Sequence, residues 1–380
     1  MLHYHVRSTN DYNHNGDNMK HLSLISAALA CGLATCVVHA QSSVQIYGLV
    51  DSGVAYVTNA DAAGRSVVKV PTLTGTFPSR VGFRGTEDLG NGLQAYFVLE
   101  NGFGPDTGTA GQGGRLFGRQ ALVGLRGDWG SLSLGRQQNM TYLATQKTDV
   151  LGPQLFSINS IDLYLPNARS DNAIGYLGTF KGVTIGATWS FGRDASAAGG
   201  PSATNCPGEV PGNAKACRQY TGLLGYESKG WGMTTSYDRM YGNTGAANGL
   251  GTASNTDTRV TLNGFVMLGA TKLGMGVIDR ETRASTGLTE SDLYYFGVSH
   301  PVGAYTFDAQ AARRDTRHSA SDVNMYVARV TYSLSKRTAV YSSLGRMANK
   351  GASAVSVDAG GTALAGVSQN GFMAGMRHTF

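Results

Sequence analysis

Apolar residues alternate with small or polar residues over many separate stretches of this chain, and the alternation limits the folds that it can adopt. In the stretch from Val183 to Phe191, every odd position is apolar and every even position is small or polar. Stretches 260–268, 305–314 and 326–334 have the same character. Side chains of a β-strand point alternately to its two faces, so each stretch predicts a strand with one apolar face. We therefore expect an all-β fold.

The composition excludes several other classes of protein. Of 380 residues, 53 are Gly and 18 are Tyr, and only 15 % are charged, against roughly 25 % in an ordinary soluble domain. So few charges argue against a disordered chain. Gly without a triplet period argues against collagen. A helical membrane protein is excluded because the only long apolar run lies near the start of the chain.

Amphipathic strands of this kind belong either to a soluble sandwich or to an outer-membrane barrel, whose apolar faces contact lipid. The stretches are about 9–13 residues long, which is enough to cross a bilayer at a tilt. Aromatic residues lie near the strand ends, as they do at membrane interfaces. Seven short connections alternate with eight long ones, and fifteen connections join sixteen strands. The long connections centre on 58–75, 104–114, 138–168, 194–217, 243–256, 284–291, 315–322 and 349–367.

The first forty residues have the pattern of an export signal. Met19 and Lys20 precede an apolar stretch that ends at Val38-His39-Ala40, a small-residue cleavage site. We expect residues 19–40 to be a signal peptide, residues 1–18 to come from a start assigned too far upstream, and residues 41–380 to be the barrel. A transmembrane anchor is the alternative, but the apolar stretch is short for one.

Two cysteines remain after the signal. Cys206 and Cys217 flank a stretch rich in Pro and Gly. In an exported protein this pair predicts one disulfide within a loop. We expect neither a metal site nor a cofactor, because the sequence has no zinc-ligand spacing and no glycine-rich phosphate loop.

Four motifs in order resemble the general porins of Gram-negative bacteria, of the neisserial and Burkholderia type: SSVQIYGLVDSGVAYV (42–57), SRVGFRGTEDLGNGLQAYFVLENGF (79–103), RQALVGLRGDWGSLSLGRQ (119–137) and the terminal RHTF. The resemblance covers essentially all of 41–380. It implies a 16-stranded antiparallel transmembrane barrel in the cell outer membrane, assembled as a homotrimer. It also implies that the long third extracellular loop, about 138–168, folds into the lumen. The last residue, Phe380, is expected to be an insertion signal for the barrel-assembly machinery.

The resemblance also implies a pore constriction, where arginines on one wall face carboxylates on the inserted loop. Arg80 and Arg84 are expected to face the lumen because Val81 and Phe83 occupy the opposite face. Arg119 and Arg169 match the wall arginines of the family pattern.

The expected acids are fewer than the arginines. Asp149 and Asp162 lie in the third loop, and Glu100 is expected to point inward and to pair with an arginine. Gln154 stands where the family often has Glu. Together with a formal charge of +6, this predicts weak or anion-leaning selectivity.

The function expected is passive diffusion of ions and small hydrophilic solutes, with outer-membrane lipid and lipopolysaccharide as surroundings. A channel specific for a sugar or an organic anion is the alternative, and an adhesin is a more distant one. Catalysis is not expected, because none of His300, His318 and His378 has a Ser or Asp at suitable spacing. Nucleic-acid binding is not expected either, because the arginines are dispersed among strands.

Overall fold

The computed structural model describes residues 43–196 and 203–380. The predicted upstream extension (1–18) and signal peptide (19–40) lie outside the described residues. Within the described residues, no helix is long and apolar enough to cross a membrane.

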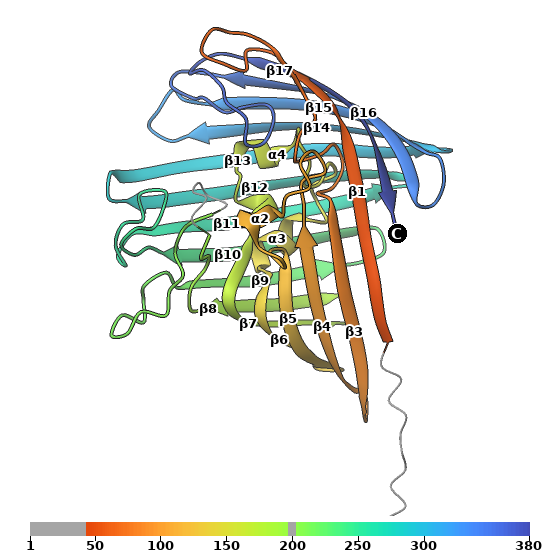
Figure 1. The fold of residues 1–380 in the computed structure, drawn as a ribbon, viewed down its shortest axis with the longest axis vertical. Helices are drawn as coiled ribbons and strands as arrows, with labels where there is room; N and C mark the ends of the chain where they lie inside the picture. The colour runs from red at the N-terminus through yellow and green to blue at the C-terminus, as the bar shows by residue number, and fades with distance from the viewer. Residues whose placement is uncertain (1–42, 197–202) are drawn as a thin grey trace, which may run out of the picture. The chain divides into compact units, whose positions relative to one another are not determined.

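Strands make up most of the described chain (Figure 1). Sixteen of the strands in the described part form the barrel wall, and one further strand, β2 (Val67–Lys69), is a three-residue addition to β1. The wall strands are β1 (Ser43–Val57), β3 (Arg80–Gly90), β4 (Leu93–Gly102), β5 (Gln120–Gly127), β6 (Gly130–Gln138), β7 (Arg169–Phe180), β8 (Val183–Ser190), β9 (Gln219–Glu227), β10 (Trp231–Tyr241), β11 (Thr256–Leu268), β12 (Thr271–Ala284), β13 (Gly287–Val302), β14 (Tyr305–Thr316), β15 (Val323–Ser333), β16 (Thr338–Asn349) and β17 (Gln369–Thr379).

The sheet closes on itself through β1. This strand pairs with β3 along one edge, where Ser43 lies opposite Thr86, and with β17 along the other, where Leu49 lies opposite Thr379. All other wall strands pair with their neighbours in sequence, and every pairing is antiparallel. Closure leaves no unpaired strand edge, which is what a sheet in hydrocarbon requires. The predicted closed barrel of sixteen strands is confirmed.

The two faces of the wall are inverted relative to a soluble protein. In β8, Ile185 and Trp189 are 47 % and 41 % exposed, whereas Thr188 and Ser190 on the other face are at most 3 % exposed. Apolar side chains therefore cover the outside, as lipid contact demands, and polar side chains line the inside.

The connections differ at the two ends of the barrel. Two-residue turns such as Lys181-Gly182 lie at the end that carries the C-terminal Phe380, and the longer segments lie at the other. In bacterial barrels the short turns are periplasmic and the long loops are extracellular. The prediction of a long loop at 284–291 is wrong, because only residues 285 and 286 separate β12 from β13. The outward-facing side chains of β12 and β13 change from apolar to charged at Asp279 and Asp292. Such a change in polarity is also typical of the point where a strand ends and a loop begins.

Four short helical turns lie in the long connections of the described residues. They are α2 (Gly111–Gly114), α3 (Met140–Thr145), α4 (Ile158–Ile161) and the 3-10 turn η1 (Leu165–Asn167). The last three all belong to one segment, residues 139–168, which joins β6 to β7.

Candidate functional site

Segment 139–168 lies against the inner face of the barrel. Helix α3 contacts β9 and β10, the Thr148 and Tyr295 hydroxyls on the segment and β13 are 2.6 Å apart, and Ser160 Oγ donates to the Val357 carbonyl at 2.9 Å. These partners are spread over most of the wall from β9 to the segment before β17. Tyr295 belongs to the inward-facing set of β13, opposite to its exposed neighbours. Figure 1 draws α3 and α4 among the strands accordingly.

Local sequence explains the turns within the segment. The Asn139 side chain caps α3 by accepting from the backbone N–H groups of Thr141 and Tyr142. The Ser157 hydroxyl caps α4 by accepting from the N–H of Asn159 at 3.2 Å. These residue types satisfy the free N–H groups of a helix start.

The underside of the segment is apolar and packs on an apolar strip of the inner wall. Gly345 and Gly371 leave room for the Phe156 ring, since a Cβ at either position would lie 3.0 Å or 2.5 Å from ring atoms. The segment contributes Leu151, Leu155, Phe156, Ile158, Ile161 and Leu165 to this buried cluster; the wall contributes Ile278, Leu293, Tyr295, Met325, Val327, Tyr341, Met347 and Met373, among others.

An ion pair attaches the C-terminal part of segment 139–168 to the barrel wall. Arg259 on β11 donates to both carboxylate oxygens of Asp162, at 2.9 and 3.2 Å, and to Asp257 at 2.6 Å. Its guanidinium also lies 4.2 Å from the centre of the Tyr164 ring. Arg259 lowers the pKa of Asp162 despite the burial of that carboxyl. Asp162 therefore attaches the segment to the wall, a role that the sequence did not indicate.

Asp149 and Gln154 have different surroundings. Asp149 accepts from Gln310 Nε2 at 2.8 Å and borders a cavity, and burial raises the pKa of its carboxyl. Gln154 is fully buried and accepts from Arg329 at 3.0 Å. Arg329 also pairs with Asp308, directly opposite on β14. A neutral residue at position 154 is therefore compatible with the positive charge of Arg329, because Asp308 already balances that charge.

Two of the predicted wall arginines lie against one carboxylate, and the charge of a third, Arg169, acts on the same groups. Glu100 accepts from Arg119 Nε at 2.6 Å and from the Tyr47 hydroxyl at 3.0 Å, and Arg80 Nε lies 3.6 Å away. Arg169 is within electrostatic range of Arg119 and Glu100. We call Arg80, Arg119, Arg169 and Glu100 the arginine cluster; its three guanidinium groups exceed its single carboxylate.

The members of the arginine cluster differ in how they are neutralised. Arg119 is buried against Glu100, and Arg80 is about a quarter exposed. Arg169 is 1 % exposed, donates to the Pro166 carbonyl at 3.0 Å, and makes no ion pair with any described residue. Its Nε and Nη2 have no hydrogen-bond partner among those residues. It is therefore the least compensated positive charge of the cluster.

Arg84 lies apart from the cluster. It points to the inner face farther toward the short-turn end, where its Nε donates to Gln45 at 2.9 Å and its guanidinium lies over Tyr47. Its side chain contacts no residue of segment 139–168.

Two inward-facing groups were not singled out from the sequence. The Asp308–Arg329 pair could have been found from strand parity, because both residues lie on the polar faces of neighbouring strands. Arg377 on β17 also faces inward and borders the same cavity as Asp149. That cavity has a volume of about 440 Å³ between segment 139–168 and the wall.

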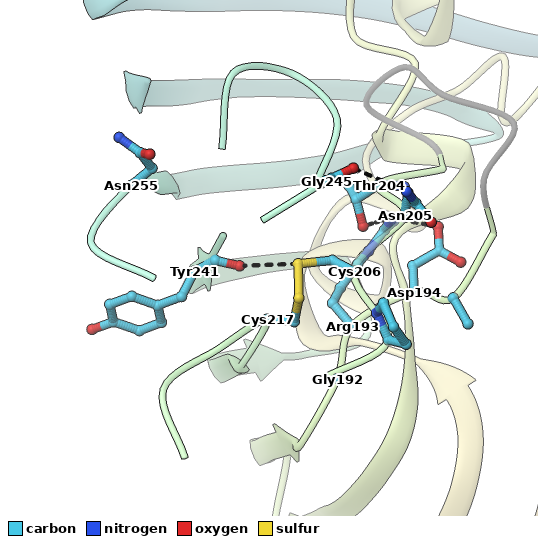
Figure 2. The surroundings of a disulfide bond; sticks show 12 residues. Gly192, Arg193, Asp194, Thr204, Asn205, Cys206, Cys217, Tyr241, Gly245 and Asn255 are labelled. Carbon is cyan, nitrogen blue, oxygen red and sulfur yellow. Dashed lines mark hydrogen bonds and ion pairs between the residues drawn. A yellow bond between two sulfur atoms is a disulfide. The ribbon is translucent and has the colours of Figure 1, made fainter. Parts of the chain in front are cut away.

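The disulfide lies in the segment between β8 and β9 (Figure 2). Cys206 and Cys217 are bonded, and Cys206 N–H also pairs with the Asp194 carbonyl. The neighbouring Arg193 donates to Asp194 at 2.9 Å and to the Asn167 carbonyl at 3.0 Å. The disulfide-bearing segment thereby contacts the end of segment 139–168.

A closed barrel with an apolar exterior, a polar interior and an internal segment defines the class of outer-membrane β-barrel channels. Residues 26–352 match the Gram-negative porin family. The chain belongs to this family, and its members are channels rather than enzymes.

Individual relatives agree with this assignment over nearly the whole chain. Outer membrane porin protein 32 of Delftia acidovorans is 32 % identical over 93 % of this chain and 98 % of its own length. An outer membrane porin protein of Bordetella pertussis is 31 % identical over 84 % of this chain and 92 % of its own length. Among solved structures, an anion-selective porin from Comamonas acidovorans superimposes with a TM-score of 0.74 at 28 % identity, over 90 % of this chain and all of its own. The outer membrane is therefore the location of this chain.

Proposed function

We propose that this porin is a general diffusion channel with anion-leaning selectivity. The observation that carries the proposal is the arginine cluster, in which two guanidinium groups lie against one carboxylate on the inner wall and Arg169, which has no ion pair in the described residues, adds a third positive charge. A surplus of positive charge in a narrow, low-dielectric passage raises the local concentration of anions. The similarity to a porin described as anion-selective supports the same conclusion.

Segment 139–168 is the proposed constriction loop of this channel. Its contacts with the inner wall support this assignment, as does the cavity that it borders with Asp149. In this proposal Arg80, Arg119 and Arg169 form the positive wall. Arg84 contributes to the field nearer the short-turn end, and Glu100 moderates the charge of the cluster. Asp162 acts only by holding the loop to Arg259.

A channel specific for an organic anion is the second candidate. Arg329 and Arg377 in the lining of the cavity offer binding groups for such an anion, and Asp149 and Asp308 lie in the same lining. Liposome swelling with a size series separates the candidates: a general pore gives rates that fall smoothly with solute size, whereas a specific channel saturates with its own solute.

The partners proposed are two further copies of this chain in a homotrimer, outer-membrane lipid and lipopolysaccharide, and the barrel-assembly machinery acting on Phe380. Apolar side chains on the outside of the first strands support an assembly or lipid contact. Val44 and Ile46 on β1 are more than 60 % exposed. Single-channel steps in groups of three would support the trimer.

The selectivity is tested by the zero-current potential of the purified channel in a planar bilayer under a KCl gradient. We expect a potential of the sign that indicates chloride preference. A potential of the opposite sign would refute the anion-leaning proposal while leaving the diffusion channel intact.

The selectivity should also depend on pH through Asp149. Burial raises the pKa of this carboxyl above its ordinary value of 3.8, so it takes up a proton before exposed carboxylates do as the pH falls. Loss of this negative charge as the pH falls should increase chloride preference by about twofold. Asp162 has a lowered pKa and should stay ionised over the same fall in pH. The Asp149→Asn channel should have the increased chloride preference before the pH is lowered and should change little as the pH falls. A pH dependence equal to that of the unmodified channel would contradict the assignment to Asp149.

A further inference from the structure

Three basic side chains on the outer face of the barrel lie beside a group of stacked aromatic rings. Tyr220 stacks on Trp189 and on Tyr237, with ring centres 5.9 and 6.1 Å apart, and its ring lies 6.3 Å from that of Tyr241. All four rings lie near the long-loop ends of β8, β9 and β10. This is the depth at which aromatic side chains meet the lipid headgroups of a membrane.

The cations lie at the edge of these rings. Arg218 lies 4.9 Å from the Trp189 ring centre, and Lys215 and Arg239 lie 5.1 and 5.4 Å from that of Tyr241. We call these three cations and four rings the rim patch. Asp238, the neighbour of Arg239 in sequence, points to the opposite, inner face and is 2 % exposed.

The three cations of the rim patch have no carboxylate partner in the described part of the chain, although Arg218 donates to the Ala214 carbonyl and Arg239 forms a hydrogen bond with Tyr237. No carboxylate lies within ion-pair distance of any of them in residues 43–196 and 203–380. The Nε atoms of Arg218 and Arg239 have no hydrogen-bond partner among these residues. Glu281, two strands from Arg239, is already bound by Arg283 at 2.7 Å.

Three outward-facing arginines at the same end of the barrel behave differently. Around β12 to β14, Arg283 pairs with Glu281, Arg313 with Asp322, and Arg317 with Asp292. The charge of these arginines is therefore balanced by carboxylates, in contrast to that of the three cations beside the aromatic rings.

We propose that the rim patch binds the phosphate groups of a phosphorylated glycolipid, lipopolysaccharide, in the outer leaflet. The argument rests on charge complementarity: three unpaired cations require anions, and their position at the lipid-facing edge gives an amphiphile, rather than a soluble solute, direct access. Guanidinium groups match phosphate oxygens in geometry, and the aromatic platform fixes their orientation. The inference rests on the outer-membrane porin assignment and names the contact for one of its proposed partners.

Trp189 provides a direct probe of the rim patch. The chain has three Trp residues, and Trp129 and Trp231 adjoin short turns at the opposite end. In a Trp129→Phe, Trp231→Phe background, Trp189 is the sole tryptophan. The refolded, channel-forming protein is titrated in zwitterionic detergent with bis-phosphorylated lipid A, with dephosphorylated lipid A and with inorganic phosphate. We expect saturable changes in emission with the phosphorylated lipid alone.

Matched variants identify the groups responsible. Replacing Lys215, Arg218 and Arg239 together by Gln should weaken binding of phosphorylated lipid A by about 100-fold, since each basic residue at a membrane surface contributes about 1 kcal/mol. The same replacement of the paired Arg283, Arg313 and Arg317 should leave binding unchanged. Equal loss in both variants, or equal binding of the dephosphorylated lipid, would overturn the proposal. A response to inorganic phosphate at the same concentrations would assign the patch to free anions instead. Unchanged single-channel conductance in both variants keeps this test independent of the porin assignment.

Discussion

The Arg169→Gln channel should lose most of its preference for chloride. Arg169 is the member of the arginine cluster without a carboxylate partner in the described chain, so its removal subtracts a full positive charge. We expect the chloride-to-potassium permeability ratio to fall by about tenfold at about 0.1 M salt, which corresponds to about 1.4 kcal/mol. The measurement is the zero-current potential in a KCl gradient.

Three companion variants make the result specific. Arg119→Gln should have a smaller effect, because Glu100 already balances Arg119 at 2.6 Å. Glu100→Gln should act in the opposite direction and strengthen chloride preference. Arg84→Gln removes the same charge away from segment 139–168 and serves as the control. If Arg169→Gln changed the potential no more than Arg84→Gln does, Arg169 would have no place in the constriction.

The same substitution should not destabilise the barrel. Two nitrogen atoms of the Arg169 guanidinium are buried without hydrogen-bond partners in the described residues, and burying such groups costs about 1–3 kcal/mol each. A glutamine can retain a bond to the Pro166 carbonyl. Thermal unfolding followed by the gel-mobility shift of the barrel should therefore be unchanged or moved upward.

The Arg259→Ala channel should have a higher and noisier conductance. Arg259 holds Asp162 of segment 139–168 and Asp257 of β11 at the same time. Its removal leaves buried carboxylates short of a partner, a change that costs about 3–5 kcal/mol when a buried ion pair is broken. The segment should be held less firmly at this end, because the adjoining Tyr164 ring also loses one of its two cations and keeps only Arg193, 5.1 Å from the ring centre. Single-channel recording and limited proteolysis within 139–168 measure the two consequences.

A rim arginine provides the control for this experiment. Arg313 also pairs with a carboxylate, Asp322, but it is 46 % exposed and contacts no residue of segment 139–168. Surface pairs of this kind contribute about 0–1 kcal/mol. Arg313→Ala should therefore leave conductance, noise and proteolysis unchanged. An Arg259→Ala channel that matched it in all three would show that Arg259 is not needed to hold the segment against the wall.

The strands were predictable because their signal is local. Alternation such as that of Val183 to Phe191 needs no partner to be recognised, and short turns fix which strands are neighbours. The predicted strand count is confirmed although residues 284–291 are not a long loop, because a turn still joins β12 to β13. The amphipathic pattern does not mark where a strand leaves the membrane, so it does not show that β12 and β13 extend to Ala284 and from Gly287.

The inner surface was less accessible to sequence reasoning. Lumen-facing positions are expected to be polar, yet Met325, Met347 and Met373 lie there under segment 139–168. No residue near these methionines in sequence reveals that segment 139–168 covers them, because the segment lies more than 150 positions earlier in the chain. The attachment of Asp162 to Arg259 was hidden in the same way, because the two residues are 97 positions apart. Strand parity does not place Arg119, because this residue precedes β5.

The fit of Phe156 beside Gly345 and Gly371 has a consequence for how this channel can close. Swinging segment 139–168 aside would hydrate three methionines and an aromatic ring at once, and each such side chain contributes about 1.5–3 kcal/mol when buried. Segment 139–168 carries few charges, so a transmembrane voltage of ordinary strength would do too little work to separate it from the inner wall. We therefore expect voltage-dependent closure of the channel to come from smaller rearrangements of side chains or from the extracellular loops, while segment 139–168 stays in place.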